Sequence, residues 1–487
     1  MVGGVMKMFY VDESSKKPLY LQLYDYLSAL IVDGTLVAGY RLPSTRKMAE
    51  DFFISRNTVE NAYSQLCADG LIESRIGSGF FVLDISNHQL DLDGMPISRL
   101  QELKEKPMRN EKKEMVEEQY PYDFFYKGLL TGTFPLDLFL ANMKDALVTK
   151  NRQFKFFECH GGEMRLRQEL AHFLKIQRGI HCSPEQIILC PCLPYAFAEI
   201  AHLFGNEKKI LAMEDPGRAS IRATFMNEGF EIKPVPVTRD GIDVDVLCKT
   251  DATLSFVMPS HQFPLGGSLS VSKRLQILDW LEKTDSYLVE HDFDCYLRYH
   301  ERPIPSIQGI SDGSRVFHVN TLEKLLYPST HMCYVVLPPT FVDKFADKFS
   351  PLHNNVSDLE QQVVYQLLRD GQFKVYLRRL ANESMKKHDI LIDALSAAMG
   401  KNAVIGGHNA GTHITLRFCD GSKASERIKQ AERVGVKVYP IEKYYYEKTA
   451  FKDDTVLIGW NIINKEDLIE GVRILCKTWF NKDTQFR

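Results

Sequence analysis

The chain has 487 residues, which is too long for a single compact core, so two or three domains are expected. Hydrophobic residues make up 44% of the chain and charged residues 25%, which is typical of folded globular proteins and argues against disorder. The formal net charge of -3 excludes an overall basic balance as a sign of nucleic-acid binding. Any DNA-binding function must therefore rest on a local motif.

The N-terminal segment from Met1 to Tyr10 lacks the basic start and apolar run of a signal peptide. No apolar stretch is long enough to span a bilayer, so we expect a cytoplasmic protein with no membrane partner. The ten cysteines are spread along the chain and do not resemble a disulfide framework. Cys190 and Cys192 form the one close pair. We interpret them as buried free thiols, with a two-ligand metal fragment as the alternative, and assign no metal site.

The first part of the chain predicts three short helices. Apolar residues recur at helical spacing over residues 18–31. Ser44 is placed to cap a second helix from Thr45 to about Phe52, and Ser55 to cap a third helix from Arg56 to about Asp69. Two short helices joined by a tight turn are typical of the helix-turn-helix, in which the first turn of the second helix enters the major groove.

The start of the third helix carries residues suited to base contacts. Arg56 and Asn57 lie in its first turn, where arginine matches guanine edges and asparagine matches adenine edges. Residues 71–75 and 77–82 predict a β-hairpin wing, in which Arg75 is placed to contact a phosphate or the minor groove. The alternative is a three-helix domain that binds no DNA, because acidic and basic residues balance in this segment.

Three segments together are similar to the GntR-type winged helix, nearly position by position. They are RLPSTR at 41–46, SRNTV at 55–59 and GSG at 77–79. The resemblance implies a DNA-binding domain over residues 15–84 and a double-stranded operator as its partner. It places six residues at the DNA, namely Ser44, Arg46, Ser55, Arg56, Thr58 and Gly77.

The amino-acid composition changes after this domain. Residues 85–120 are interpreted as a linker, because the stretch 101–119 is rich in Lys and Glu and poor in apolar residues. Residues 121–487 alternate short apolar runs with amphipathic helices, which predicts an α/β domain with a mostly parallel sheet. The predicted strands are 186–189, 209–212, 254–258, 286–289 and 316–319, and the predicted helices include 164–175, 272–283 and 359–369.

Motifs along this second domain resemble the MocR subfamily of GntR regulators. They are EDPG at 214–217, PSHQFPLG at 259–266, EHDFD at 290–294 and NTLEKLLYP at 320–328. The resemblance covers nearly the whole chain. It implies a winged helix fused to a fold-type I aminotransferase-like domain, which ends in a small α+β subdomain and forms homodimers. The implied cofactor is pyridoxal phosphate (PLP).

Within this resemblance, Lys324 matches the lysine that forms the Schiff base with PLP. The aspartate that holds the pyridine nitrogen aligns with His291, and the tyrosine that bonds the ring hydroxyl aligns with Phe293. An imidazole stabilises a pyridinium less than a carboxylate does, and a phenyl ring donates no hydrogen bond. Both side chains share one face of a strand. A one-residue shift would bring Asp292 inward, but its acidic neighbours argue against that register.

The expected phosphate contacts have changed as well. The small hydroxyl residue before the lysine is Glu323, which would repel a phosphate, and the arginine seven residues after the lysine is His331. The turn expected to contain glycine reads CPCLP at 190–194, in which each proline removes an N–H. The tyrosine expected to cover the ring is Arg218. Two interpretations stay open. These positions form either a site that has changed to bind another ligand, or a solvated pocket that no longer binds one.

We therefore expect a DNA-binding transcription regulator whose large domain dimerises and senses a small molecule. PLP, or an amine or amino acid, is the candidate effector. The substitutions at His291 and Phe293 argue against aminotransferase turnover, and no catalytic residue is assigned. Two alternatives stay open: an active PLP-dependent aminotransferase with an accessory DNA-binding domain, and a cofactor-free dimerisation scaffold.

Overall fold

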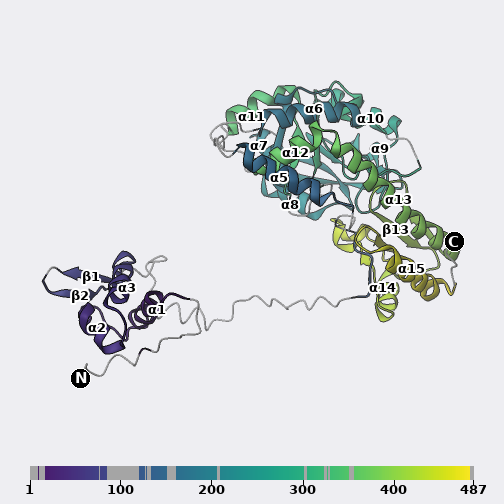
Figure 1. Cartoon of the computed structure of the whole chain (residues 1–487). Coiled ribbons are helices and arrows are strands. Elements are labelled where there is room, and N and C mark those ends of the chain that lie inside the picture. The colour runs from purple at the N-terminus through teal and green to yellow at the C-terminus, as the bar shows by residue number, and fades with distance from the viewer. Residues whose placement is uncertain are drawn as a thin grey trace. The chain divides into compact units, whose positions relative to one another are not determined.

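The chain divides into two compact units, Met1–Glu118 and Gln119–Arg487, which are drawn in Figure 1. The structure, a computed structural model, describes residues 9, 17–75, 77–84, 120–126, 128, 133–150, 161–205, 209–300, 304–322, 326, 330–349 and 356–482. The predicted linker at 85–120 lies outside the described residues, apart from Tyr120.

The small unit contains the predicted three helices and hairpin. Its elements are α1 (Leu19–Val32), α2 (Thr45–Phe52), α3 (Arg56–Ala68), β1 (Ile72–Arg75) and β2 (Gly79–Val82). The apolar stripe that predicted α1 is the face that is buried, through Leu23, Leu27 and Ile31. Tyr63 of α3 is fully buried and donates a hydrogen bond to the Pro43 carbonyl at 2.9 Å. This contact ties α3 to the segment that leads into α2.

The large unit is built on one eight-stranded sheet in the order β4-β11-β10-β9-β8-β5-β6-β7. The strands are β4 (Ile187–Cys190), β5 (Ile210–Asp215), β6 (Glu231–Thr238), β7 (Gly241–Ile242), β8 (Leu254–Val257), β9 (Tyr287–His291), β10 (Val316–Thr321) and β11 (Cys333–Val336). Neighbouring strands are parallel except at β11, which is antiparallel to β10 and β4, and at the short β7. The predicted mostly parallel sheet is confirmed.

Helices cover both faces of this sheet. They are α5 (Leu136–Lys150), α6 (Met164–Arg178), α7 (Leu193–Leu203), α8 (Ala219–Asn227), α9 (Val244–Leu247), α10 (Val271–Thr284), α11 (Val342–Phe349) and α12 (Asp358–Arg369). The alternation along β4 shows the two faces. Ile187 and Leu189 pack into the core cluster that contains α6 and α12, whereas Ile188 and Cys190 pack into the cluster that contains α7. Burial on both faces explains why the predicted strands are continuous apolar runs.

The C-terminal part forms a smaller α+β layer, as the family resemblance implies. Its antiparallel sheet has the order β12-β13-β16-β15, and β14 pairs with β3. The elements are β3 (Tyr122–Asp123), α13 (Gln372–Met399), β12 (Ala403–Gly406), β13 (His413–Phe418), α14 (Ala424–Arg433), β14 (Val436–Lys437), β15 (Tyr439–Pro440), β16 (Thr455–Gly459) and α15 (Lys465–Phe480). Figure 1 shows the long α13 running from the large layer into this smaller one. Among the described helices, none has the length and apolar content needed to cross a bilayer.

Candidate functional site

Two serines cap the helices of the predicted helix-turn-helix. Ser44 Oγ accepts a hydrogen bond from the Lys47 backbone N–H at 3.2 Å, and Ser55 Oγ accepts one from Thr58 N–H at 3.1 Å. Both predicted caps are therefore confirmed. The turn between the helices passes through Phe53, whose φ of 55° puts it in the left-handed region. A single left-handed residue reverses the chain quickly enough to keep α2 and α3 in contact.

The side chains at the predicted DNA-contact positions lie at the surface. Seven of these residues are exposed and one, Thr58, is half-buried; the exposed ones are Ser44, Arg46, Ser55, Arg56, Asn57, Arg75 and Gly77. The Ser55 and Thr58 hydroxyls lie 2.7 Å apart, next to the N-terminal backbone N–H groups of α3. These groups form a polar, electropositive helix start, which is the geometry that binds phosphate.

Four cations on this surface have an acidic partner. The pairs are Arg46 with Glu50, Lys47 with Asp51, Arg56 with Glu60, and Arg75 with Glu73. The Arg56 Nε–Glu60 Oε1 distance is 2.8 Å. Such exposed pairs contribute only about 0–1 kcal/mol, so a phosphate or a base edge can replace the carboxylate at little cost. The pairing also explains the balanced charge of this segment.

In the wing, the Arg75 guanidinium packs against the aromatic ring of Phe81. Arg75 lies opposite Gly79 in the β1–β2 pairing, and its guanidinium stands 4.6 Å from the Phe81 ring centroid. The guanidinium of Arg41 lies 6.0 Å from the same ring. A planar guanidinium over a ring loses little freedom on binding, because the stacking already restricts it.

In the large unit, His291 is the last residue of β9 and Phe293 lies in the turn that follows, with ring centroids 5.8 Å apart. Contrary to the expectation from the sequence, the two residues therefore do not share one face of a strand, although their rings are close. His291 is fully buried, and its ring lies 5.8 Å from Phe197 of α7 and 6.0 Å from Phe256 of β8. Thus an imidazole among phenyl rings stands where the family has an aspartate. An imidazole carries no negative charge in either its neutral or its protonated form, so this position does not supply the anion that a pyridinium requires.

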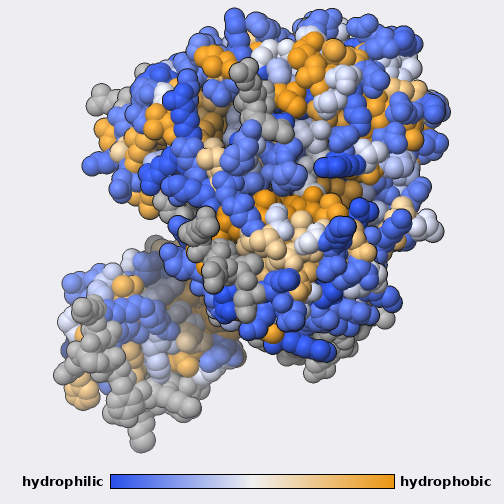
Figure 2. Space-filling model, turned by 90° about the vertical axis from the view of Figure 1, so that its right-hand side faces the viewer, coloured by the Kyte–Doolittle hydropathy of each residue, from blue (hydrophilic) through white to orange (hydrophobic). Residues whose placement is uncertain are grey.

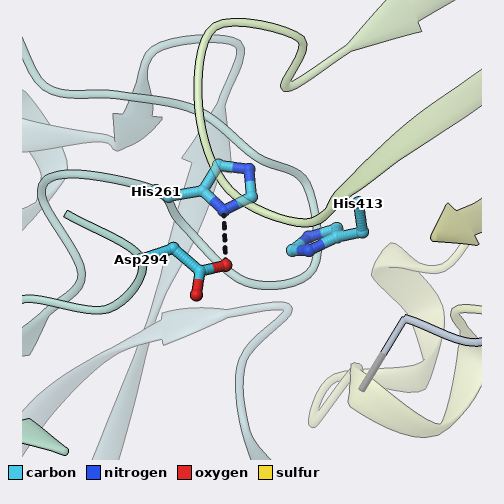
Figure 3. Close-up of side chains that lie close together, drawn as sticks. All are labelled: His261, Asp294 and His413. Atoms are coloured by element: carbon cyan, nitrogen blue, oxygen red, sulfur yellow. Dashed lines mark ion pairs between the residues drawn. The ribbon is translucent and has the colours of Figure 1, made fainter. Parts of the chain in front are cut away.

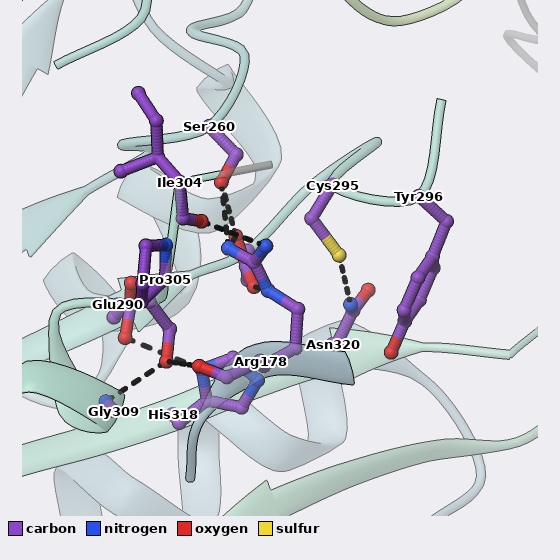
Figure 4. A network of polar contacts seen from close by, with 12 residues as sticks. Arg178, Ser260, Glu290, Cys295, Tyr296, Ile304, Pro305, Gly309, His318 and Asn320 are labelled. Carbon is purple, nitrogen blue, oxygen red and sulfur yellow. Dashed lines mark hydrogen bonds and ion pairs between the residues drawn. The ribbon is translucent and has the colours of Figure 1, made fainter. Parts of the chain in front are cut away.

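Asp292 points to a different set of partners. Its two carboxylate oxygens accept hydrogen bonds from Arg178 at 2.6 and 3.1 Å, and Ser260 Oγ donates to it at 2.5 Å. Burial by itself would raise the pKa of Asp292, but the Arg178 charge and these hydrogen bonds outweigh it and lower the pKa to about 2. Figure 4 shows this network around Arg178. Asp292 is paired with Arg178. The one-residue shift that would place Asp292 at the cofactor position is therefore not adopted.

Arg178 and Ser260 are polar residues that the sequence analysis missed. Arg178 is the last residue of α6, which ends because Gly179 takes a left-handed conformation (φ 74°). Its guanidinium also donates to the Ile304 carbonyl at 2.9 Å. A lone arginine at a helix end carries no sequence signal, since its buried partner lies more than a hundred residues further along the chain. Only the fold brings the two together.

Arg218 occupies a cage of two phenyl rings. Its guanidinium carbon lies 4.5 Å from the centroid of Phe263 and 4.5 Å from that of Phe293. The family places a ring-covering tyrosine here, and this chain instead places a cation between two aromatic faces. His331 is exposed at the surface. Lys324 and Glu323 lie outside the described residues.

The start of α7 is a poor cradle for a phosphate. Pro194 stands in its first turn, and the N-cap residue Cys192 makes no side-chain capping bond. Nearby, Cys190 Sγ donates to Glu199 Oε2 at 3.3 Å, and burial raises the pKa of Glu199 to about 7. The missing N–H groups and the adjacent carboxyl both weaken phosphate binding. Together with His291 and Phe293, they show that the described residues do not fit PLP.

The sequence of the whole chain has relatives among bacterial regulators. Residues 19–82 match the family described as "Bacterial regulatory proteins, gntR family". The HTH-type transcriptional regulator YdeL of Bacillus subtilis (strain 168) is 31% identical over 95% of this chain and 97% of its own length. The probable rhizopine catabolism regulatory protein MocR of Rhizobium meliloti is 28% identical over 96% and 95%. The chain belongs to the MocR-type GntR regulators.

The large unit of this MocR-type protein is similar in fold to solved structures. An archaeal alanine:glyoxylate aminotransferase superposes with a TM-score of 0.67 over 79% of this chain and 94% of its own, at 21% identity. The large unit therefore has the aminotransferase fold. At this level of identity the likeness shows the fold alone, and the altered pocket residues govern its chemistry.

Proposed function

We propose that this MocR-type regulator reads a double-stranded operator with α2, α3 and the wing, and that its aminotransferase-like unit responds to a small molecule other than PLP. The observation that carries the DNA part is the capped helix pair, which exposes Arg46, Arg56 and Asn57 at adjacent helix starts. Arginine and asparagine supply the bidentate donors that read guanine and adenine edges. A regulator of this kind works where operator DNA is accessible, so we place it in the cytoplasm.

The apolar surface of the large unit supports a homodimer. Helix α5 leaves four aliphatic side chains exposed, namely Leu136, Leu140, Leu147 and Val148, with exposed fractions of 45–69%. Figure 2 shows further hydrophobic surface where the layer built on the eight-stranded sheet meets the smaller C-terminal layer. Exposed apolar faces of this kind are typical of protein interfaces. A two-fold dimer would carry two winged helices to the two halves of one operator.

The ligand part of the proposal rests on the changed pocket. A pocket opens beside the ends of β9 and β10, and its lining includes Phe293, Asp294, Asn320 and Thr321. Parallel sheets bind ligands at the carboxyl ends of their strands, which is where these residues lie. The Arg218 cage beside it adds one cation and two aromatic faces. An effector with an anionic or aromatic group suits these contacts better than a pyridinium does.

The DNA-binding part is tested by titrating the purified chain with its own promoter DNA at several salt concentrations. We expect sequence-dependent binding that weakens steeply as salt rises. Arg56→Ala should weaken this binding, whereas Arg473→Ala, which removes a half-buried arginine paired with Glu470 on α15, should leave it unchanged. Equal binding to promoter and unrelated DNA would overturn the proposed operator recognition.

The ligand part is tested by adding PLP, removing the excess and recording the visible absorbance of wild type and Lys324→Ala. We expect wild type to retain no Schiff-base band. The matched comparison is the double variant His291→Asp with Phe293→Tyr, which returns an acid and a phenol to the pocket and should retain more PLP. A strong band in wild type that disappears in Lys324→Ala would show that PLP is held despite these substitutions.

A further inference from the structure

Three side chains from distant parts of the sequence converge inside the large unit, next to Phe293, and none of the three is among the positions expected to hold PLP. His261 follows β8, Asp294 follows β9, and His413 is the first residue of β13 in the four-stranded sheet. Figure 3 shows the three side chains pointing toward one another. One possible ligand atom from each lies within 4.8 Å of the other two. Two imidazoles and a carboxylate are donors that Zn²⁺ and similar transition-metal ions prefer.

The cluster is withdrawn from solvent. His261 is 0% exposed and His413 1%, and the Asp294 side chain is 4% exposed. Within the described part of the chain, neither ring nitrogen of His261 makes a hydrogen bond. The hydroxyl of Thr412, next to His413, is also buried without a hydrogen bond among these residues. Buried polar groups are almost always satisfied, so this arrangement points to a bound species.

The spacing between the donors suits a shared ion better than a direct hydrogen bond. His261 Nδ1 lies 3.4 Å from Asp294 Oδ2. A charge-assisted N–H···O bond is shorter, at about 2.7–2.9 Å. Two ligands bound at about 2.0–2.2 Å to one tetrahedral ion lie roughly 3.3–3.5 Å apart. The observed separation therefore matches one edge of a tetrahedral site.

The surrounding backbone holds the imidazoles in place. A Cβ on Gly411 would lie 2.1 Å from the His261 ring, and one on Gly266 would lie 3.2 Å from its Nε2. Glycine at both positions lets the backbone close around the ring. His413 Nε2 lies 3.2 Å from the Pro264 carbonyl. A carbonyl at this distance fixes the ring orientation, as partners of metal-binding histidines usually do.

A second cluster of similar composition provides a contrast. His300 Nε2 and His388 Nδ1 lie 2.9 and 2.8 Å from the same Asp389 oxygen, and His388 Nε2 lies 2.7 Å from the His408 carbonyl. These are ordinary hydrogen-bond distances, and His300 is exposed. That cluster is satisfied by its own bonds, so it serves as the control site.

We propose that His261, Asp294 and His413 bind one divalent transition-metal ion, with Zn²⁺ as the best match to two imidazoles and one carboxylate. Three protein ligands leave a fourth position for water or a small ligand. The pocket that is lined by Asp294 and Thr412 borders the cluster. The ion joins the loops after β8 and β9 to the C-terminal sheet, because His413 belongs to that sheet.

The test uses the full chain, stripped of metal with a chelator and titrated with Co²⁺, whose visible absorption reports four- or five-coordinate binding. We expect one equivalent to bind with a visible band, and Zn²⁺ to displace it and raise the melting temperature. His261→Ala and His413→Gln should weaken binding by more than the roughly 10–100-fold typical of outer-shell partners. Asp294→Asn should weaken it too, because a neutral amide is a poorer ligand.

The control variant is His300→Ala, which alters the second cluster and should leave Co²⁺ binding unchanged. Circular dichroism of His413→Gln separates loss of a ligand from loss of folding, because glutamine keeps a polar side chain of similar length. The proposal is overturned if wild type takes up no Co²⁺ or Zn²⁺. It is also overturned if folded His413→Gln binds as tightly as wild type, or if His300→Ala loses binding to the same extent.

Discussion

The small unit retains the GntR pattern at its expected DNA contacts, whereas the large unit has the aminotransferase fold with other side chains at the positions that the family resemblance aligns with PLP contacts. In the small unit, exposed Arg56 and Asn57 stand on a capped helix. In the large unit, the buried His291 and Phe293 occupy positions that the family resemblance aligns with an acid and a phenol. The contrast shows that a fold can persist after its ligand contacts change, because packing is set by the core and chemistry by a few side chains.

The largest effect is expected at the buried ion pair that engages Asp292. Arg178→Met should lower the free energy of unfolding by about 3–5 kcal/mol, because it leaves a carboxylate buried without its cation. The measurement is denaturant unfolding of the full chain. Arg473→Met, at a half-buried surface pair, is the control and should change stability by less than about 1 kcal/mol. Adding Asp292→Leu to Arg178→Met should restore part of the loss, and no recovery would count against this assignment.

A smaller effect is expected for the first turn of α3. Arg56→Ala should cost about 1–3 kcal/mol of specific DNA binding, which is roughly a 5–150-fold loss of affinity, if Arg56 reads a base edge. Fluorescence anisotropy with promoter and scrambled duplexes measures the difference. If the loss is equal for both duplexes, Arg56 contacts phosphate and not a base.

The pH dependence of stability should reflect the titration of the Glu214 carboxyl group, near the C-terminal end of β5. Burial raises the pKa of Glu214 to about 8, although the Met258 N–H and the Gln262 amide donate to its carboxylate. Its folded pKa is above its unfolded value near 4.5, so the folded state binds more protons between these values. Stability should therefore fall as pH rises through this window, by at most about 1.4 kcal/mol per pH unit.

Glu214→Gln removes this titration and should reduce the fall of the melting temperature between pH 5 and pH 8, measured by calorimetry. The exposed Glu442→Gln is the control and should leave the slope unchanged. A wild-type melting temperature that rises over this range would contradict the sign of the effect.

The smallest expected effect comes from the acidic partner of Arg56. Glu60→Gln removes an exposed ion pair worth about 0–1 kcal/mol and also removes a negative charge near the DNA. DNA affinity should rise by up to about fivefold at low salt, and the gain should shrink at high salt. Asp279→Asn, on α10 of the large unit, is a matched exposed control. A loss of affinity in Glu60→Gln would show that Glu60 positions Arg56 for binding.

The sequence alone was enough to predict the local elements and their caps. Ser44 and Ser55 cap their helices because a hydroxyl before a helix satisfies nearby N–H groups, whatever the rest of the fold does. The strands of the large sheet were predictable because burial on both faces demands continuous apolar runs. The expected shared strand face of His291 and Phe293 was wrong, because β9 ends at His291 and Phe293 lies in the turn that follows.

The tertiary structure alone decided which distant polar residues meet. Arg178 pairs with Asp292, and His261 and Asp294 meet His413, across separations of more than a hundred residues. No local period or spacing encodes such contacts, because they depend on strand order in the sheet and on where loops return to it. The sequence determined the helices, strands and family pattern through local propensity and burial. The fold determined the polar clusters, because only a packed interior makes a buried charge require a partner.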